Sequence, residues 1–386
     1  EQPGLQLKLS SQLSDMALRL PGDLSKPDNK RADFQFVFSD YPEYSDLLAQ
    51  YDEKINLQMR WNAGIQKMRS DIRIYDGMPG ELKEGINVSA NLDVFDYRQW
   101  EKLFVPLLNK TKKQSTAVSV NGIKLKAKQF VIDDYVFDAV TLHGKMIDQQ
   151  WLVDVNTDIF FGEIRFSDEF NKDSPVYVQF EKLDLTPLIN DDKEENKSQA
   201  KMSPAELPPF KVSGKNLTYK NFHFNSMNLE TSRSRYGLTV HALDLKADDL
   251  SVQMKGNWFR KNLSDDHSSF RVELNSNDVG AMLASFKLTE SLKEGKGSAI
   301  VDWQWSASPF DFDWNLVSGN LQLDIEDGRF IDVEPGAGRV LGMFSLSSLP
   351  KRFMLDFSDT FTEGYEFNEL SIKAKRIDSS HDTNKT

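Results

Sequence analysis

The sequence predicts a mainly β protein: one long, curled antiparallel sheet that forms an apolar groove, with a few short amphipathic helices. Two observations lead to this fold class. Apolar and polar side chains alternate along most of the chain, which is typical of strands with one apolar and one solvated face. Helical patterns are scarce, and a few short helices cannot cover the apolar faces of roughly twenty strands.

The alternation first appears at Phe34, where Phe36 and Phe38 share a face and Gln35 and Val37 lie opposite. The same period of two recurs along the rest of the chain. We predict that the apolar members of these runs line the groove: Phe34, Phe36, Phe38, Ile55, Leu57, Met59, Trp61, Val176, Val178, Phe180, Phe222, Phe224, Phe270, Val272, Leu274, Val301, Trp303, Trp305, Phe310, Phe312, Trp314, Leu321, Leu323 and Ile325.

Four segments have a pattern that favours helix: Ser45–Tyr51, Tyr97–Leu108, Val279–Leu292 and Gly338–Leu349. The second of them spaces apolar residues three or four apart, as an amphipathic helix does. The fourth must end at Leu349, because a proline disfavours helix in the residue before it.

An internal repeat and one polar run organise the chain. Residues Ile123–Leu142 align without gaps on Phe210–Leu229, which indicates stacked β-meander units. Residues Asn190–Pro209 are polar and charged, and they read as a mobile loop or linker. We therefore predict a first part of the sheet over 1–189, with a helix near 97–108, and a second part over 210–386.

The composition excludes several classes of protein. Among 386 residues, 59 carboxylates and 47 bases give a formal charge of −12, so nucleic acid would be repelled. Cysteine is absent, which excludes disulfides, thiolate zinc sites and iron–sulfur clusters.

No constellation of residues predicts catalysis, a cofactor or a metal. The five histidines have no metal-ligand spacing, and no serine lies in a nucleophile elbow. Asp311 and Asp313 alternate with aromatic residues and lack the spacing of a calcium loop. The run Gly336–Gly342 has the spacing GxGxxxG, without the βαβ unit of a nucleotide site. We expect a protein that is not an enzyme.

The segment from Val340 to Leu349 carries no charge at all. A helix that is apolar nearly all round is either buried or in contact with a membrane, and both readings stay open here. We hypothesise that this helix closes or gates the groove through Val340, Leu341, Phe344 and Leu349.

The stretch Leu321–Phe367 contains the most specific motifs of the chain. They are the run Gly328–Arg339, Ser345–Pro350, Leu355–Asp359 and Gly364, and upstream elements include Leu20–Pro27, Leu92–Leu103 and Val279–Lys296. These residues resemble the C-terminal portion of YhdP-type proteins of the AsmA-like family, whose relatives include TamB and AsmA. The chain stops soon after Phe367 and shows neither the family's apolar C-terminal segment nor its inner-membrane anchor, so we expect a fragment or a truncated member.

The resemblance implies a bridge-like lipid transfer protein of the Gram-negative envelope. It implies phospholipids as ligands, a periplasmic location, and contact with the inner and outer membranes through segments outside this chain, with anchoring in the inner membrane. Neither the resemblance nor the residues name a protein partner.

Two other functions stay open on the residues alone. The first is a structural or assembly scaffold of the envelope, in which two sheets pack as a closed β-sandwich and no ligand enters. The second is a carbohydrate-active β-solenoid, which would need exposed aromatic residues and paired carboxylates on one face.

Overall fold

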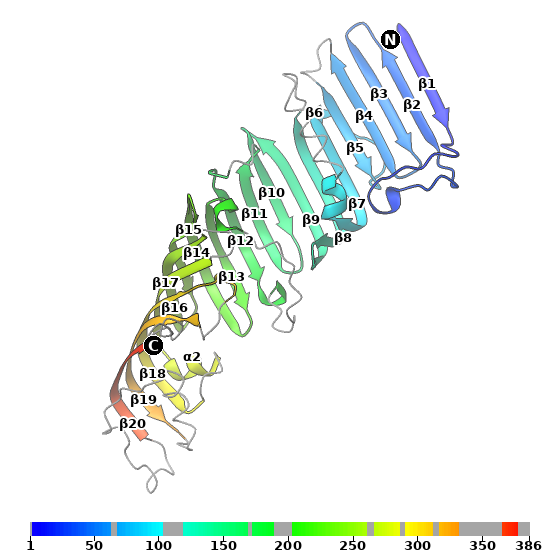
Figure 1. The fold of residues 1–386 in the computed structure, drawn as a ribbon. Coiled ribbons are helices and arrows are strands. Elements are labelled where there is room, and N and C mark those ends of the chain that lie inside the picture. Colours follow the sequence, from blue (N-terminus) through cyan, green and yellow to red (C-terminus); the bar gives the residue numbers. More distant parts are fainter. Residues whose placement is uncertain are drawn as a thin grey trace, which may run out of the picture. The chain divides into compact units, whose positions relative to one another are not determined.

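The computed structural model describes residues 2–62, 68–102, 119–168, 172–188, 203–260, 266–285, 290–311, 316–331 and 365–376. In these residues, twenty strands belong to one mixed sheet, and the chain divides into two compact units, Glu1–Glu169 and Phe170–Thr386. The predicted fold class, a mainly β protein with a long and mostly antiparallel sheet, is confirmed (Figure 1).

The first unit, unit 1, is a meander in which most consecutive strands pair (Figure 1). Its elements are β1 (Leu5–Ser11), η1 (Gly22–Leu24), β2 (Phe34–Asp40), β3 (Tyr44–Tyr51), β4 (Ile55–Asn62), β5 (Arg69–Ile74), β6 (Lys83–Glu84), β7 (Ile86–Asp96), β8 (Val120–Ile132), β9 (Tyr135–Ile147), β10 (Gln150–Asn156) and β11 (Phe160–Ser167).

The second unit, unit 2, repeats this plan with longer strands. Its elements are β12 (Val176–Asp184), η3 (Thr186–Leu188), η4 (Pro204–Glu206), β13 (Phe210–Tyr219), β14 (Phe222–Ser234), β15 (Gly237–Lys246), β16 (Leu250–Arg260), β17 (Asp266–Ser276), α2 (Val279–Ser285), β18 (Leu292–Trp305), β19 (Ser318–Phe330) and β20 (Tyr365–Arg376).

Most neighbouring strands are antiparallel, but β5–β7, β7–β8 and β12–β13 pair in parallel. Parallel neighbours need a crossover connection, because a tight hairpin cannot join them. The connection from β7 to β8 begins with a helix over 97–102, and the connection from β12 to β13 contains η3 and η4. This second connection includes the run 190–209, of which only 203–209 lie among the described residues.

The internal repeat corresponds to two hairpins of matching register. Phe130 pairs with Phe137 in β8–β9, and the equivalent Leu217 pairs with Phe224 in β13–β14. The turn residues Asp133 and Lys220, which also correspond, both have φ of 52°. The sequence repeat is therefore a repeat of structure.

The four predicted helices had different outcomes. The prediction for Ser45–Tyr51 was wrong: the segment lies in β3 and pairs in register with both β2 and β4. The prediction for Tyr97–Leu108 is confirmed over 97–102, where the described part ends. The third helix is α2, which is shorter than predicted because Leu292 begins β18. The segment Gly338–Leu349 lies outside the described residues.

No helix among the described residues is long and apolar enough to cross a bilayer. Side chains are fully buried mainly in a few separate clusters, which lie where a short helix or a turn packs on the sheet.

Candidate functional site

The strands of unit 1 carry an apolar face that runs unbroken from strand to strand. Residues in register on neighbouring strands point to the same side of a sheet, so the pairings trace rows across it. One row crosses ten strands without a polar side chain: Leu9, Phe36, Ala49, Leu57, Ile72, Val88, Ile123, Gly144, Val153 and Ile164.

The opposite side of unit 1 is a polar face. The row that lies one residue away on every strand contains no apolar side chain: Ser10, Gln35, Gln50, Asn56, Arg73, Ser89, Lys124, His143, Asp154 and Glu163. The two rows show that the sheet of unit 1 separates an apolar side from a charged and amide-rich side.

Unit 2 shows the same division. Its apolar row crosses nine strands and consists of Val178, Val212, Leu229, Leu243, Met254, Val272, Val301, Leu321 and Ala374. The adjacent row on the polar face has a single apolar member, Ile300, among Gln179, Ser213, Asn228, Asp244, Gln253, Glu273, Gln322 and Lys373.

The apolar rows are only partly covered. In the row of unit 2, Val301 is buried at 5% exposure, whereas Met254, Val272 and Leu321 remain half-buried. The packed interior between two sheets would bury such side chains almost completely. The middle of the apolar face therefore keeps surface that an apolar ligand can cover.

A cap packs on one part of the apolar face of unit 1. Leu24 of η1 and Trp100 of the helix over 97–102 are 2% and 5% exposed, and they share a cluster with Leu125. The Trp100 ring stacks on Phe95 with centroids 5.4 Å apart. The backbone N–H of Gly22 donates to the Gln99 side chain at 2.9 Å, which ties η1 to the helix.

Helix α2 covers one end of the apolar face in unit 2. Val279 is 1% exposed and packs in a cluster with Leu292 and Ile325. A Cβ atom on Gly280 would lie 2.6 Å from the carbonyl oxygen of Leu292, so the missing side chain allows helix and strand backbones to touch. Figure 1 shows α2 lying along β18.

A second edge of the apolar face in unit 2 is covered by the turn after β18. The Ser268 hydroxyl donates to the carbonyl of Ala307 at 2.8 Å, and Ser268 has no exposed surface. Val317, at 1% exposure, packs there with Phe270 and Trp305. The half-buried rows of unit 2 therefore lie between two covered strand ends.

The structure brings most of the predicted lining residues together on these two apolar faces. Phe36, Leu57, Val178, Val272, Val301 and Leu321 lie in the rows themselves. Others lie two or four residues along the same strands and so share the face: Phe34, Phe38, Ile55, Met59, Trp61, Val176, Phe180, Phe270, Leu274, Trp303, Trp305, Leu323 and Ile325.

Phe222 and Phe224 do not follow the period of two that leads to Leu229 in the apolar row, because each lies an odd number of residues from Leu229 on β14. Phe224 pairs with Leu217, and the two side chains are 6% and 3% exposed. The Phe222 ring stacks on Phe224 with centroids 6.2 Å apart.

Phe310 corrects the sequence prediction, because it does not lie in a strand. It lies in a turn, is 83% exposed, and touches the edge of the Trp258 ring with centroids 5.8 Å apart. The chain turns here because Ser308 accepts a hydrogen bond from the backbone N–H of Asp311 at 3.1 Å. Phe312, Trp314 and the predicted gating residues Val340, Leu341, Phe344 and Leu349 lie outside the described residues.

Glycines on the apolar side lie beneath aromatic rings of the neighbouring strand, a feature that sequence analysis missed. A Cβ on Gly214 would lie 2.4 Å from the Phe180 ring, and one on Gly328 would lie 2.4 Å from the Phe367 ring. Each pair is in direct register across two strands. A glycine inside a strand pattern does signal, in the sequence, that a neighbouring group approaches the backbone closely. Only the strand pairing shows which aromatic ring that group is.

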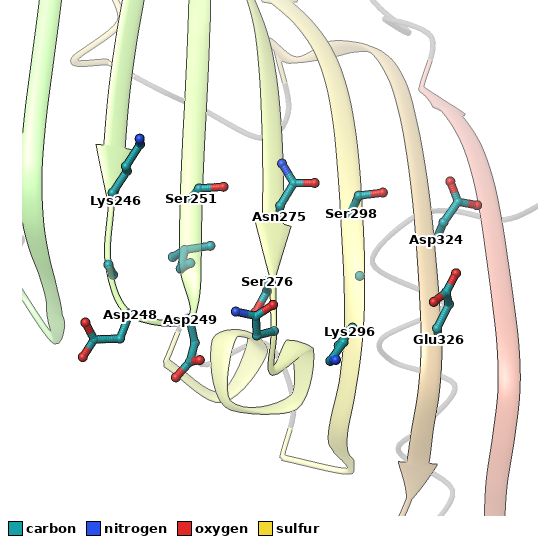
Figure 2. Close-up of a pocket in the computed structure, with 14 residues that line it drawn as sticks. Lys246, Asp248, Asp249, Ser251, Asn275, Ser276, Lys296, Ser298, Asp324 and Glu326 are labelled. Atoms are coloured by element: carbon teal, nitrogen blue, oxygen red, sulfur yellow. The ribbon is translucent and has the colours of Figure 1, made fainter.

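Two hollows in unit 2 are lined mainly by the polar face. The larger, about 440 Å³, has a floor of Ser251, Asn275 and Ser298, with Lys246 and Asp324 at its sides (Figure 2). The hydroxyl of Ser371 and the amide of Gln322 donate to Asp324, and these bonds lower the pKa of that carboxyl below its ordinary value. With charges of both signs, this hollow is unsuited to an acyl chain.

No group of three or more acidic, histidine or cysteine side chains within the described ranges could hold a metal ion. The arrangement of the described side chains thus offers an extended apolar surface with a charged reverse side.

Comparison with known proteins gives the family. The model of the YhdP protein family matches residues 1–386. The chain belongs to the YhdP family. A stretch of 120 residues is 24% identical to the intermembrane phospholipid transporter YhdP of Escherichia coli (strain K12), and covers 31% of this chain and 9% of that protein. No solved structure matches the chain.

Proposed function

We propose that the apolar faces of units 1 and 2 bind the acyl chains of phospholipids, and that the protein carries these lipids between the inner and outer membranes. The observation that carries the proposal is the unbroken apolar row across ten strands in unit 1 and nine in unit 2. The half-buried state of these side chains leaves surface for a ligand.

The energetics of such a face suit transport rather than tight storage. Covering a methylene group with apolar surface is favourable by about 0.8 kcal/mol, wherever along the face this happens. A row without polar interruptions offers similar contacts at each strand. A lipid chain can therefore shift from strand to strand without crossing a site where it must be solvated.

Membership of the YhdP family supports this proposal, because a relative in the family is named as an intermembrane phospholipid transporter. A periplasmic location follows from the same proposal. The proposed role needs no covalent step, so we propose a carrier without catalytic residues or a cofactor.

The proposal can be tested by native mass spectrometry on the protein purified from a Gram-negative host without harsh detergent. We expect phospholipid to copurify with the folded protein, and added fluorescent phospholipid to bind to it. A folded protein that is free of lipid and refuses the fluorescent probe would contradict the proposal.

A structural scaffold of the cell envelope is the second candidate, and the caps favour it. Leu24 and Trp100 in unit 1, and Val279 in unit 2, pack as tightly as a dry protein core. If such packing extended over the whole apolar face, no lipid would enter. The apolar rows of units 1 and 2 are only half-buried, however, and this favours the lipid carrier over the scaffold.

A further inference from the structure

The turn that carries Phe310 lies at an edge of the apolar face of unit 2, and its backbone is held in place. The carbonyl of Ser308 accepts hydrogen bonds from the Trp305 indole N–H and from the Asp311 backbone N–H, both at 3.1 Å. The hydroxyl of Ser308 accepts a third bond from the backbone N–H of Phe310, also at 3.1 Å. Ser308 itself is 8% exposed. The backbone from which the Phe310 ring projects is thus held in place by the turn.

The ring of Phe310 is nevertheless 83% exposed, more than any other large apolar side chain among the described residues. It meets the Trp258 ring edge to face, at an interplanar angle of 87°. Trp258 is 4% exposed and pairs with the half-buried Leu238 and with Ser268, which has no exposed surface. Because the backbone at Phe310 is already held, a ligand that covers the ring orders only the side chain and not the turn.

We propose that Phe310 is a rim residue that contacts the lipid: its ring lies against an acyl chain bound on the apolar face of unit 2 and shields that chain from water. This inference rests on the proposed function. The carboxylate of Asp311 follows directly in the chain, and a phosphate group beside it would be repelled. The ring therefore meets the hydrocarbon part of the lipid and not its headgroup.

The chain offers three phenylalanines for a matched test. Phe310 lies at the rim, and Phe36 lies half-buried in the apolar row of unit 1. Phe161 is 51% exposed on the polar face, where it pairs with Asn156. Each can be replaced, one at a time, by the photo-crosslinking analogue p-benzoylphenylalanine in the full-length protein in a Gram-negative host. Irradiation followed by mass spectrometry then shows which positions carry phospholipid.

We expect lipid adducts at positions 310 and 36, and none at 161. An adduct at 36 alone would overturn the role of Phe310 and leave the proposed function standing. No adduct at either position would overturn both. Equal labelling at all three positions would show that lipid does not select the apolar face, and would also overturn the inference.

Truncation of the ring gives a second readout. We expect Phe310→Ala to lower the lipid retained after purification by about fourfold for each methylene group left uncovered. The midpoint of unfolding should not change, since the ring is exposed. Phe161→Ala should change neither quantity. If Phe310→Ala leaves the retained lipid unchanged, the inference is wrong.

Discussion

At the residue scale, the ion pair between Arg260 and Asp266 differs from the other ion pairs of the described chain in being buried. The two side chains are 8% and 7% exposed, with 2.7 Å between their charged groups. Asp266 also accepts the indole N–H of Trp258 at 3.0 Å. These contacts hold the edge of unit 2 against which Phe310 packs.

Replacing Asp266 should therefore be costly. Asp266→Asn leaves the Arg260 charge buried without its counter-charge, and we expect a loss of about 3–5 kcal/mol in the free energy of unfolding. Chemical denaturation, monitored by tryptophan fluorescence, measures this loss in the free energy of unfolding. The control is Asp93→Asn, whose partner Lys128 is 80% exposed, and which should not shift the midpoint. Equal effects of the two substitutions would contradict the account.

Asp76 provides a pH-dependent contribution on the polar face of unit 1. Burial alone would raise its pKa, but hydrogen bonds from Ser89 and Arg73 outweigh it and lower the pKa below the ordinary value of 3.8. A depressed pKa in the folded state stabilises that state above about pH 3.8, and this contribution is lost as the pH falls through the lowered pKa.

Ser89→Ala should accordingly raise the pKa of Asp76, because it removes a hydrogen bond to the ionised carboxylate. A pH titration, monitored by NMR of the Asp76 carboxyl group, measures this pKa directly. We also expect the variant to have a lower free energy of unfolding than the parent protein at neutral pH. This difference should shrink once the pH falls below the pKa of Asp76 in both proteins. An unchanged pKa of Asp76 would contradict the role given to the Ser89 hydroxyl.

At the element scale, the packing of α2 against β18 depends on one glycine, Gly280. Helix propensity alone predicts that Gly280→Ala stabilises α2 by about 0.5–1 kcal/mol. The contact with β18 predicts the opposite, because the new Cβ would lie 2.6–2.8 Å from the backbone of residues 292–294. We expect a net loss of about 1–3 kcal/mol in the free energy of unfolding.

Thermal unfolding decides the sign of this change. Ser285→Ala on the same helix is the control: its hydroxyl donates to the carbonyl of Ala281 within the helix, and we expect a small effect on the free energy of unfolding. A Gly280→Ala variant that is more stable than the parent protein would show that α2 does not touch β18 as described.

The elements also show how far the sequence predicts this structure. Phe36 and Leu57 lie in one row across the sheet, and the period of two is visible in the sequence because strands with one buried face alternate in polarity. The segment Ser45–Tyr51 contains good helix formers, and its pairing with β2 and β4 overrode their local preference. Phe310 followed the alternation of its neighbours, but a turn centred on Ser308 decides its position.

The parts of the site that were missed depend on contacts between distant residues. The contact between Gly280 and Leu292, and the cover that Phe180 provides for Gly214, arise only when strands take their register. A glycine in the sequence indicates a close approach but does not name the partner.

At the scale of the whole molecule, the proposed lipid binding depends on keeping apolar and polar side chains on opposite faces across many strands. No single side chain forms the site, so single conservative substitutions on the apolar face should have small effects on lipid binding. A charge placed in the apolar row is different, because it must be solvated where a hydrocarbon chain should pass.

The most direct test of this claim is a pair of adjacent substitutions in β4. Leu57 lies in the apolar row of unit 1, Gln58 lies on the polar face, and both are half-buried. Phospholipid retained by the folded full-length protein is measured by native mass spectrometry for Leu57→Asp and for Gln58→Asp. We expect Leu57→Asp to lose lipid and Gln58→Asp to keep it. Equal retention by the two folded variants would contradict the assignment of the apolar face as the lipid-binding surface.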